Sequence, residues 1–124
     1  MIIFLAEDDE DDALFFKEAV SELLSNADLM IFTNGEKLMN QLDTNEVLPD
    51  IIFLDLNMPK KNGFECLKEI KSNSSLKAIK TIILSTTSDD VQIKKCDSLG
   101  ADMFLTKVNS YNKFKLILES CLST

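Results

Sequence analysis

The sequence contains no histidine, no arginine and no tryptophan, and it has only 3 glycines and 2 prolines. The absence of histidine excludes a histidine-based catalytic triad, an imidazole general base and a histidine metal site. Any metal bound by this chain should therefore be a hard cation held by oxygen atoms. The absence of arginine removes the planar fork with which many DNA-binding proteins read guanine or grip phosphate.

Positive charge is also scarce. The 13 basic residues are all lysines, against 21 acidic residues, and the formal net charge is −8 at pH 7. Such a surface disfavours contact with nucleic acid and would be repelled by an anionic membrane. We expect no direct nucleic-acid partner and no membrane partner.

The remaining absences concern targeting and redox state. The apolar start, Met1 to Ala6, is too short for a signal peptide, and no apolar run is long enough to span a bilayer. The cysteines, Cys66, Cys96 and Cys121, are odd in number and far apart. This pattern is typical of reduced thiols, and we expect a cytoplasmic protein.

What the sequence does contain is a regular alternation of short apolar runs and helix-like segments over 124 residues. The runs are nearly continuous, as in parallel strands buried on both faces. Between them, apolar residues recur at helical spacing, and Gly100 is a plausible helix stop. We predict strands at Ile2–Ala6, Leu29–Phe32, Ile51–Leu54, Thr81–Leu84 and Met103–Leu105, a first helix that includes Leu14 to Leu24, and helices at Gly35–Leu42, Gly63–Ile70, Asp89–Leu99 and Tyr111–Leu122.

The alternation predicts an α/β fold of the (βα)5 type: a doubly wound, five-stranded parallel sheet with the flavodoxin-like order 2-1-3-4-5. The length suits one domain over residues 1–124, with no output domain. In open sheets of this kind, ligands bind beyond the carboxyl ends of the strands.

Chemically active side chains follow four of the predicted strands. In this strand order Glu7 and Asp8 lie beside Asp55, and carboxylates that close repel one another. A divalent cation relieves the repulsion, and Mg²⁺ suits a site with few carboxylates and several waters. Lys107 would then favour an arriving phosphoryl group. The residues at the four strand ends are Glu7, Asp8 and Asp9, then Asp55, then Ser85 and Thr86, then Lys107.

Each of these residues alone is ordinary: acids at a helix start, a hydroxyl at a strand end, a lysine on the surface. Their joint placement indicates a phosphoryl-transfer site. The stretches LAEDDEDD, DIIFLDLNMPKKNG, TIILSTT and LGADMFLTK resemble the receiver domain of two-component response regulators over the whole chain. That family places a hydroxyl residue 30 positions and a lysine 52 positions after its phosphoacceptor, as Ser85 and Lys107 stand after Asp55. Gly63 matches the family's glycine.

The resemblance implies that Asp55 accepts a phosphoryl group from a sensor histidine kinase or a histidine phosphotransfer protein. It implies that Asp8 and Asp55 ligate Mg²⁺, that Asn57 adds its backbone carbonyl, and that Glu7 acts through water. Asp9 is left as an alternative to Glu7 or Asp8.

The resemblance also implies a switch. Ser85, or Thr86 if the register slips by one, would turn toward the phosphate, and Lys107 would pair with it. Phe104 matches the family's switch aromatic, and Thr87 a position that tunes hydrolysis. The fourth helix, fifth strand and fifth helix would then present the signal to a separate downstream target protein.

One departure concerns Val108, which stands where the family usually has a proline after its lysine, often with a cis peptide bond. A non-proline cis bond costs about 3–4 kcal/mol, so we expect a trans bond or a strained loop here.

Three other functions compete with the switch. A degenerate receiver that binds partners without phosphorylation is the main alternative, and Val108 is the feature that favours it. A phosphatase of the haloacid-dehalogenase type would need a second acid where the chain has Asn57. A nucleotide-binding domain would need a glycine-rich motif that is absent. We therefore expect a signalling module and not a dedicated enzyme.

Overall fold

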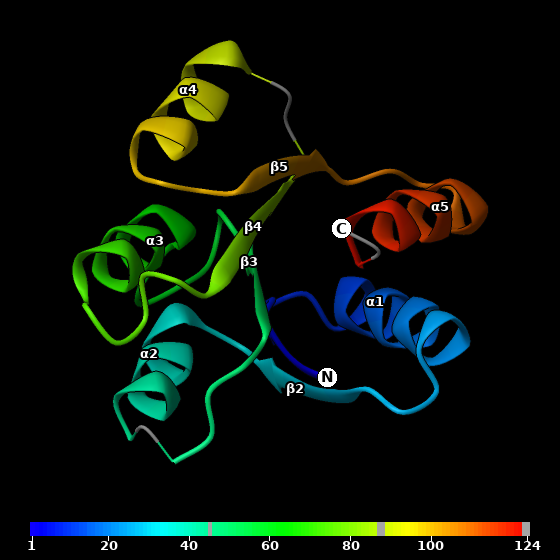
Figure 1. Ribbon diagram of the computed structural model, residues 1–124. Coiled ribbons are helices and arrows are strands. Elements are labelled where there is room, and N and C mark those ends of the chain that lie inside the picture. Colours follow the sequence, from blue (N-terminus) through cyan, green and yellow to red (C-terminus); the bar gives the residue numbers. More distant parts are fainter. Residues whose placement is uncertain (45, 87–88, 123–124) are drawn as a thin grey trace.

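The computed structural model describes residues 1–44, 46–86 and 89–122. Its elements are β1 (Ile2–Ala6), α1 (Glu10–Leu23), β2 (Asp28–Phe32), α2 (Gly35–Asp43), β3 (Ile51–Asp55), α3 (Gly63–Ser72), β4 (Lys80–Ser85), α4 (Asp90–Ser98), β5 (Met103–Thr106) and α5 (Tyr111–Leu122). The strands form one parallel sheet in the order β2-β1-β3-β4-β5, which confirms the predicted fold class. Figure 1 shows α1 and α5 on one face of the sheet and α2, α3 and α4 on the other. Within the described ranges, no helix is both long and apolar enough to cross a bilayer.

Two apolar layers, one on each face of the sheet, form the core. Side chains alternate along β1, so that Phe4 and Ala6 pack toward α2 and α3 while Ile3 and Leu5 pack toward α1 and α5. The central strands β1, β3 and β4 are almost wholly buried, as their continuous apolar runs predict. The edge strands β2 and β5 are more exposed than predicted, because each pairs with a neighbour on one side only.

Strands β3 and β4 each extend one residue beyond the apolar runs. The parallel ladder pairs Asp55 with Leu84 and Ser85 with Thr106. Backbone pairing does not require an apolar side chain, so the sheet continues into these polar residues. The directions of the Asp55 and Ser85 side chains are therefore set by the sheet and not by a loop.

Capping residues determine where the helices begin. Asp9 accepts a hydrogen bond of 3.0 Å from the backbone amide of Asp12 at the start of α1. Asn62 and Glu65 form a reciprocal capping box at the start of α3. Gly100, with φ of 99°, follows α4 as predicted. These caps start α1 four residues after the end of β1 and α3 eight residues after the end of β3.

Gly63, the first residue of α3, lies against the backbone that follows β3. A Cβ atom at this position would lie 2.5 Å from the carbonyl oxygen of Asp55 and 2.9 Å from the Cα of Leu56. The Gly63 amide also donates a hydrogen bond of 3.1 Å to the Leu56 carbonyl. The missing side chain thus lets α3 start directly beside the segment that carries Asp55.

We expect Gly63→Ala to destabilise the domain by about 1–3 kcal/mol, the usual cost of overpacking, because rigid backbone must move. Urea unfolding measures this change. Asn62→Ala, which removes a cap worth about 1 kcal/mol, is the neighbouring control. Only Gly63→Ala should also shift the NMR signals of Asp55 and Leu56. Unchanged stability together with unchanged signals in Gly63→Ala would show that the close approach is tolerated.

Candidate functional site

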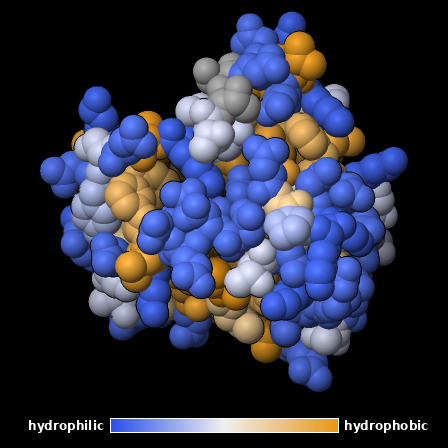
Figure 2. All heavy atoms as spheres, turned by 180° about the vertical axis from the view of Figure 1, so that it is seen from behind, coloured by the Kyte–Doolittle hydropathy of each residue, from blue (hydrophilic) through white to orange (hydrophobic). Residues whose placement is uncertain are grey.

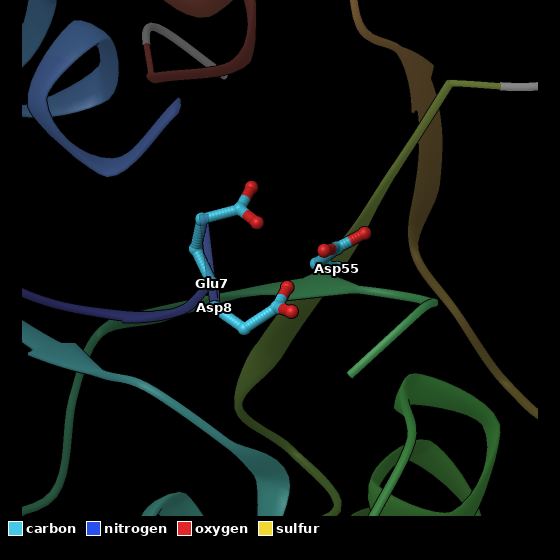
Figure 3. Close-up of side chains that lie close together, drawn as sticks. All are labelled: Glu7, Asp8 and Asp55. Carbon is cyan, nitrogen blue, oxygen red and sulfur yellow. The ribbon is translucent and has the colours of Figure 1, made fainter. Parts of the chain in front are cut away.

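Three carboxylates meet at the carboxyl ends of β1 and β3. Glu7, Asp8 and Asp55 can each offer one oxygen atom, and these atoms all lie within 4.8 Å of one another. Figure 3 shows the three carboxylate groups around one small space. Glu7 and Asp55 are 3% and 5% exposed, whereas Asp8 lies open to solvent. The structure therefore brings together the acids that the sequence places after these two strands.

Lys107 follows β5 and reaches the same space. Its ammonium nitrogen lies 2.6 Å from Oε1 of Glu7, 3.0 Å from Oδ2 of Asp12 and 3.6 Å from Oδ2 of Asp55. Its backbone amide donates a hydrogen bond of 2.6 Å to the carbonyl of Ser85, which ties the loop after β5 to the end of β4. One half-buried cation thus faces three carboxylates: one directly after β1, one at the end of β3 and one in α1.

Burial perturbs the ionisation of these groups. Burial and a hydrogen bond with Asp55 raise the pKa of Glu7 to about 8, against the opposing effect of Lys107. Burial also raises the pKa of Asp55 above its usual value. Burial by itself would lower the pKa of Lys107, but its hydrogen bonds to Glu7 and Asp12 and the charge of Asp55 raise it overall. Without a bound cation, protonation of the Glu7–Asp55 pair therefore persists to higher pH than for isolated carboxyl groups.

The predicted switch residues lie at the ends of β4 and in β5. Ser85 is fully buried as the last residue of β4, whereas Thr86 is exposed. Phe104 is half-buried in β5 and packs against the core layer that includes Cys96 of α4. Thr87 lies outside the described residues. Of the two hydroxyl candidates, Ser85 is the buried one, and it ends the strand that pairs with β3.

Two further predicted residues have defined positions. The backbone amide of Asn57 lies 3.4 Å from Oδ1 of Asp55 and donates a hydrogen bond to it. The Asp9 side chain is engaged as the N-cap of α1 and is not part of the carboxylate group. Asp9 therefore does not replace Glu7 or Asp8 in the cluster.

Asp12 is the site residue that sequence reasoning missed. The sequence indicates only an acid in the first turn of a helix, yet its carboxylate contacts Lys107, 95 positions away. A carboxylate one helical turn past the acidic strand end is the signal that could have identified it.

The peptide bond between Lys107 and Val108 is trans, as expected. Val108 borders a cavity of about 30 Å³ that lies against the stem of Lys107. Apolar side chains of β1, α1, β4 and α5 line the cavity, together with Glu7 and Asp12: Leu5, Phe15, Phe16, Leu84 and Phe114.

The surroundings of the site are hydrophilic. Figure 2 shows the face at the carboxyl ends of the strands, and hydrophilic residues cover most of it. Oxygen ligands, one ammonium group and access to water together suit a hard divalent cation and a dianionic group bound beside it.

Comparison with known proteins gives a consistent result. The family model of the response regulator receiver domain matches residues 3–119. The response regulator Rcp1 of Synechocystis sp. is 33% identical over 94% of this chain and 83% of its own length. The two-component response regulator ARR17 of Arabidopsis thaliana is 31% identical over 91% of this chain and 84% of its own length.

Solved structures agree in fold. A phosphorylated cyanobacterial phytochrome response regulator, RcpA, superimposes with a TM-score of 0.90 and 32% identity, covering 97% of this chain and 89% of that one. The Mn²⁺-bound form of Rcp1 superimposes with a TM-score of 0.89 and 30% identity, covering 98% and 91%.

The raised pKa of Glu7 predicts a pH-dependent stability. Unfolding returns this pKa from about 8 to about 4.5, so between these values the folded state binds more protons. The free energy of unfolding of the metal-free protein should therefore fall as pH rises through this window. Urea unfolding in EDTA at pH 5 to 8.5 measures the slope.

Glu7→Gln should flatten this slope, because the amide does not titrate. Glu10→Gln, which changes an exposed carboxylate in α1, is the control and should keep the wild-type slope. Equal slopes in Glu7→Gln and the wild type would assign the pH dependence to other groups.

Proposed function

Because the chain belongs to the family of response regulator receiver domains, we propose that Asp55 accepts a phosphoryl group with Mg²⁺ bound beside it. The family assignment makes the chain a receiver domain of two-component signalling. The observation that most supports the specific proposal is the arrangement of Glu7, Asp8 and Asp55 around one space, with Lys107 in reach.

The donor set fits Mg²⁺. The three acids offer only oxygen atoms, which are the ligands that this ion prefers, and an exposed Asp8 leaves room for the waters it retains. We propose that Asp8, Asp55 and the Asn57 carbonyl ligate it, and that Glu7 acts through water. When bound, Mg²⁺ would neutralise charge on the transferring phosphoryl group.

In the proposed transfer, a carboxylate oxygen of Asp55 attacks phosphorus on a phosphohistidine of the donor. The new P–O bond forms as the P–N bond breaks, and the electron pair goes to the imidazole nitrogen. The Asn57 amide, 3.4 Å from Oδ1, helps to orient the carboxylate before attack. Lys107 supplies a positive charge for the phosphoryl oxygens after transfer.

Phosphorylation then acts as a switch because it creates contacts that exist in one conformation only. To move an equilibrium from 1:99 to 99:1 takes about 5.5 kcal/mol, and one charge-assisted hydrogen bond supplies about 1.5–3 kcal/mol. We therefore propose that Ser85 and Lys107 both contribute. Phe104 would transmit the change, since it packs in the same core layer as α4.

The proposed phosphodonor is a sensor histidine kinase or a histidine phosphotransfer protein. The proposed downstream target is a separate protein that contacts α4, β5 and α5.

The covalent chemistry is limited to Asp55, so we propose a signalling module and not a dedicated enzyme. Cys66 and Cys96 are buried thiols outside any disulfide, which supports a reducing compartment such as the cytoplasm. A phosphorylation-independent receiver is not favoured, since the acids and Lys107 lie together.

Labelling by acetyl phosphate tests the proposal. With Mg²⁺, the intact mass of the wild type should rise by one phosphoryl group, because Asp55 is the nucleophile. EDTA should abolish the gain, and so should Asp55→Asn, which removes the attacking oxygen's charge. Asp97→Asn, at an exposed position of α4, should label like the wild type. Equal labelling of Asp55→Asn, or no labelling of a folded wild type, would refute the assignment.

The switch is tested by Phe104→Ala. Beryllofluoride, an acyl phosphate mimic, should shift NMR amide signals of the site, α4 and α5 in the wild type. In Phe104→Ala the site should still respond, whereas the shifts in α4 should fall by more than half because the packing link is removed. Met103→Ala, whose side chain packs toward the opposite core layer, is the matched control. Undiminished α4 shifts in Phe104→Ala would rule out this route.

A further inference from the structure

The ammonium group of Lys107 is closest to the two carboxylates that would not accept the phosphoryl group. It lies 2.6 Å from Glu7 and 3.0 Å from Asp12, but 3.6 Å from Asp55. Glu7 and Asp12 lie within hydrogen-bond distance of the ammonium group, whereas Asp55 lies in ion-pair range only. A phosphoryl oxygen that binds Lys107 beside Asp55 must therefore compete with the Glu7 and Asp12 contacts for the ammonium group.

Asp12 is the acceptor that the rest of the site does not need. It is not among the carboxylates that can share a cation, and its side chain is 46% exposed. It also leaves the capping of α1 to Asp9, whose side chain binds the Asp12 backbone amide. The Asp12 carboxylate is thus committed to Lys107 alone among the contacts of the described residues.

We propose that Asp12 is a positioning residue that holds Lys107 back from Asp55 in the resting domain and so weakens the binding of a phosphoryl group. This inference rests on the proposed function of Asp55. The Asp12 contact stabilises the resting position of the ammonium group, and by linkage it lowers the affinity of any ligand that requires Lys107 elsewhere.

A cavity of about 30 Å³ lies beside the stem of Lys107 and is lined by Phe15, Phe16 and Val108 among others. The apolar stem can therefore adjust along this surface while the charged end stays in contact with solvent and carboxylates.

The test compares Asp12→Asn with Asp11→Asn. Asp11 occupies the same helical turn and is exposed, and within the described part of the chain it makes no ion pair with Lys107. Both substitutions remove one negative charge near the site, so the general electrostatic effect is common to them. The probe is beryllofluoride with saturating Mg²⁺, titrated by fluorine NMR.

Asp12→Asn should lower the half-saturating beryllofluoride concentration about two- to five-fold relative to Asp11→Asn, the range expected for one partly exposed ion pair. In protein without metal or beryllofluoride, the ammonium resonance of Lys107, assigned by its loss in Lys107→Ala, should shift in Asp12→Asn only. If the Asp12 contact only stabilised the fold, Asp12→Asn would have a lower melting temperature. Its beryllofluoride affinity would then equal that of Asp11→Asn.

The remaining outcomes are distinct. Equal or weaker binding by Asp12→Asn, with a wild type that saturates, would overturn the role of Asp12 and leave the proposed function intact. An unmoved Lys107 resonance would overturn it as well. A folded wild type that never binds beryllofluoride would contradict the proposed function, and with it the affinity that Asp12 is proposed to set.

Discussion

Like charges at the carboxyl ends of β1 and β3 repel one another, and the fold holds them together against that repulsion. Glu7 and Asp55 are both nearly inaccessible to water, which makes their charged forms costly. Lys107 offsets part of this cost, but a single cation does not neutralise all the acids around it. The site therefore keeps an excess of negative charge, which a bound divalent cation would neutralise.

The scaffold supplies the rigidity that such a site requires. Central strands buried on both faces fix the backbone at Glu7 and Asp55, and the α3 start at Gly63 presses directly on the segment behind Asp55. The hydrogen bond between the Lys107 amide and the Ser85 carbonyl joins the remaining two strand ends. Asp55 ends a paired strand, whereas Glu7 and Lys107 directly follow β1 and β5 and are held there by backbone hydrogen bonds to Phe32 and Ser85.

Much of this arrangement was predictable because strand ends in a parallel sheet converge whatever the side-chain rotamers are. Glu7, Asp8 and Asp55 could be placed together from strand order alone. The contact between Asp12 and Lys107 could not, because it depends on the directions of two side chains from segments far apart in sequence. The predicted bounds of β1 were right, whereas β3, β4 and β5 were predicted to end one residue early, because an apolar pattern stops at a polar residue although the backbone ladder does not.

Strand pairing also determines where the fold tolerates insertions and deletions. Asp55 and Ser85 are the terminal residues of paired strands, and side chains alternate between the two faces with every residue. An inserted or deleted residue inside β3 or β4 would turn these groups from one face of the sheet to the other while leaving a sheet that still pairs. Changes of length in the connection between α1 and β2, at the opposite edge, carry no such consequence. Among related receiver domains, insertions and deletions should therefore accumulate in the connections at the amino ends of the strands. They should be absent from β3 and β4.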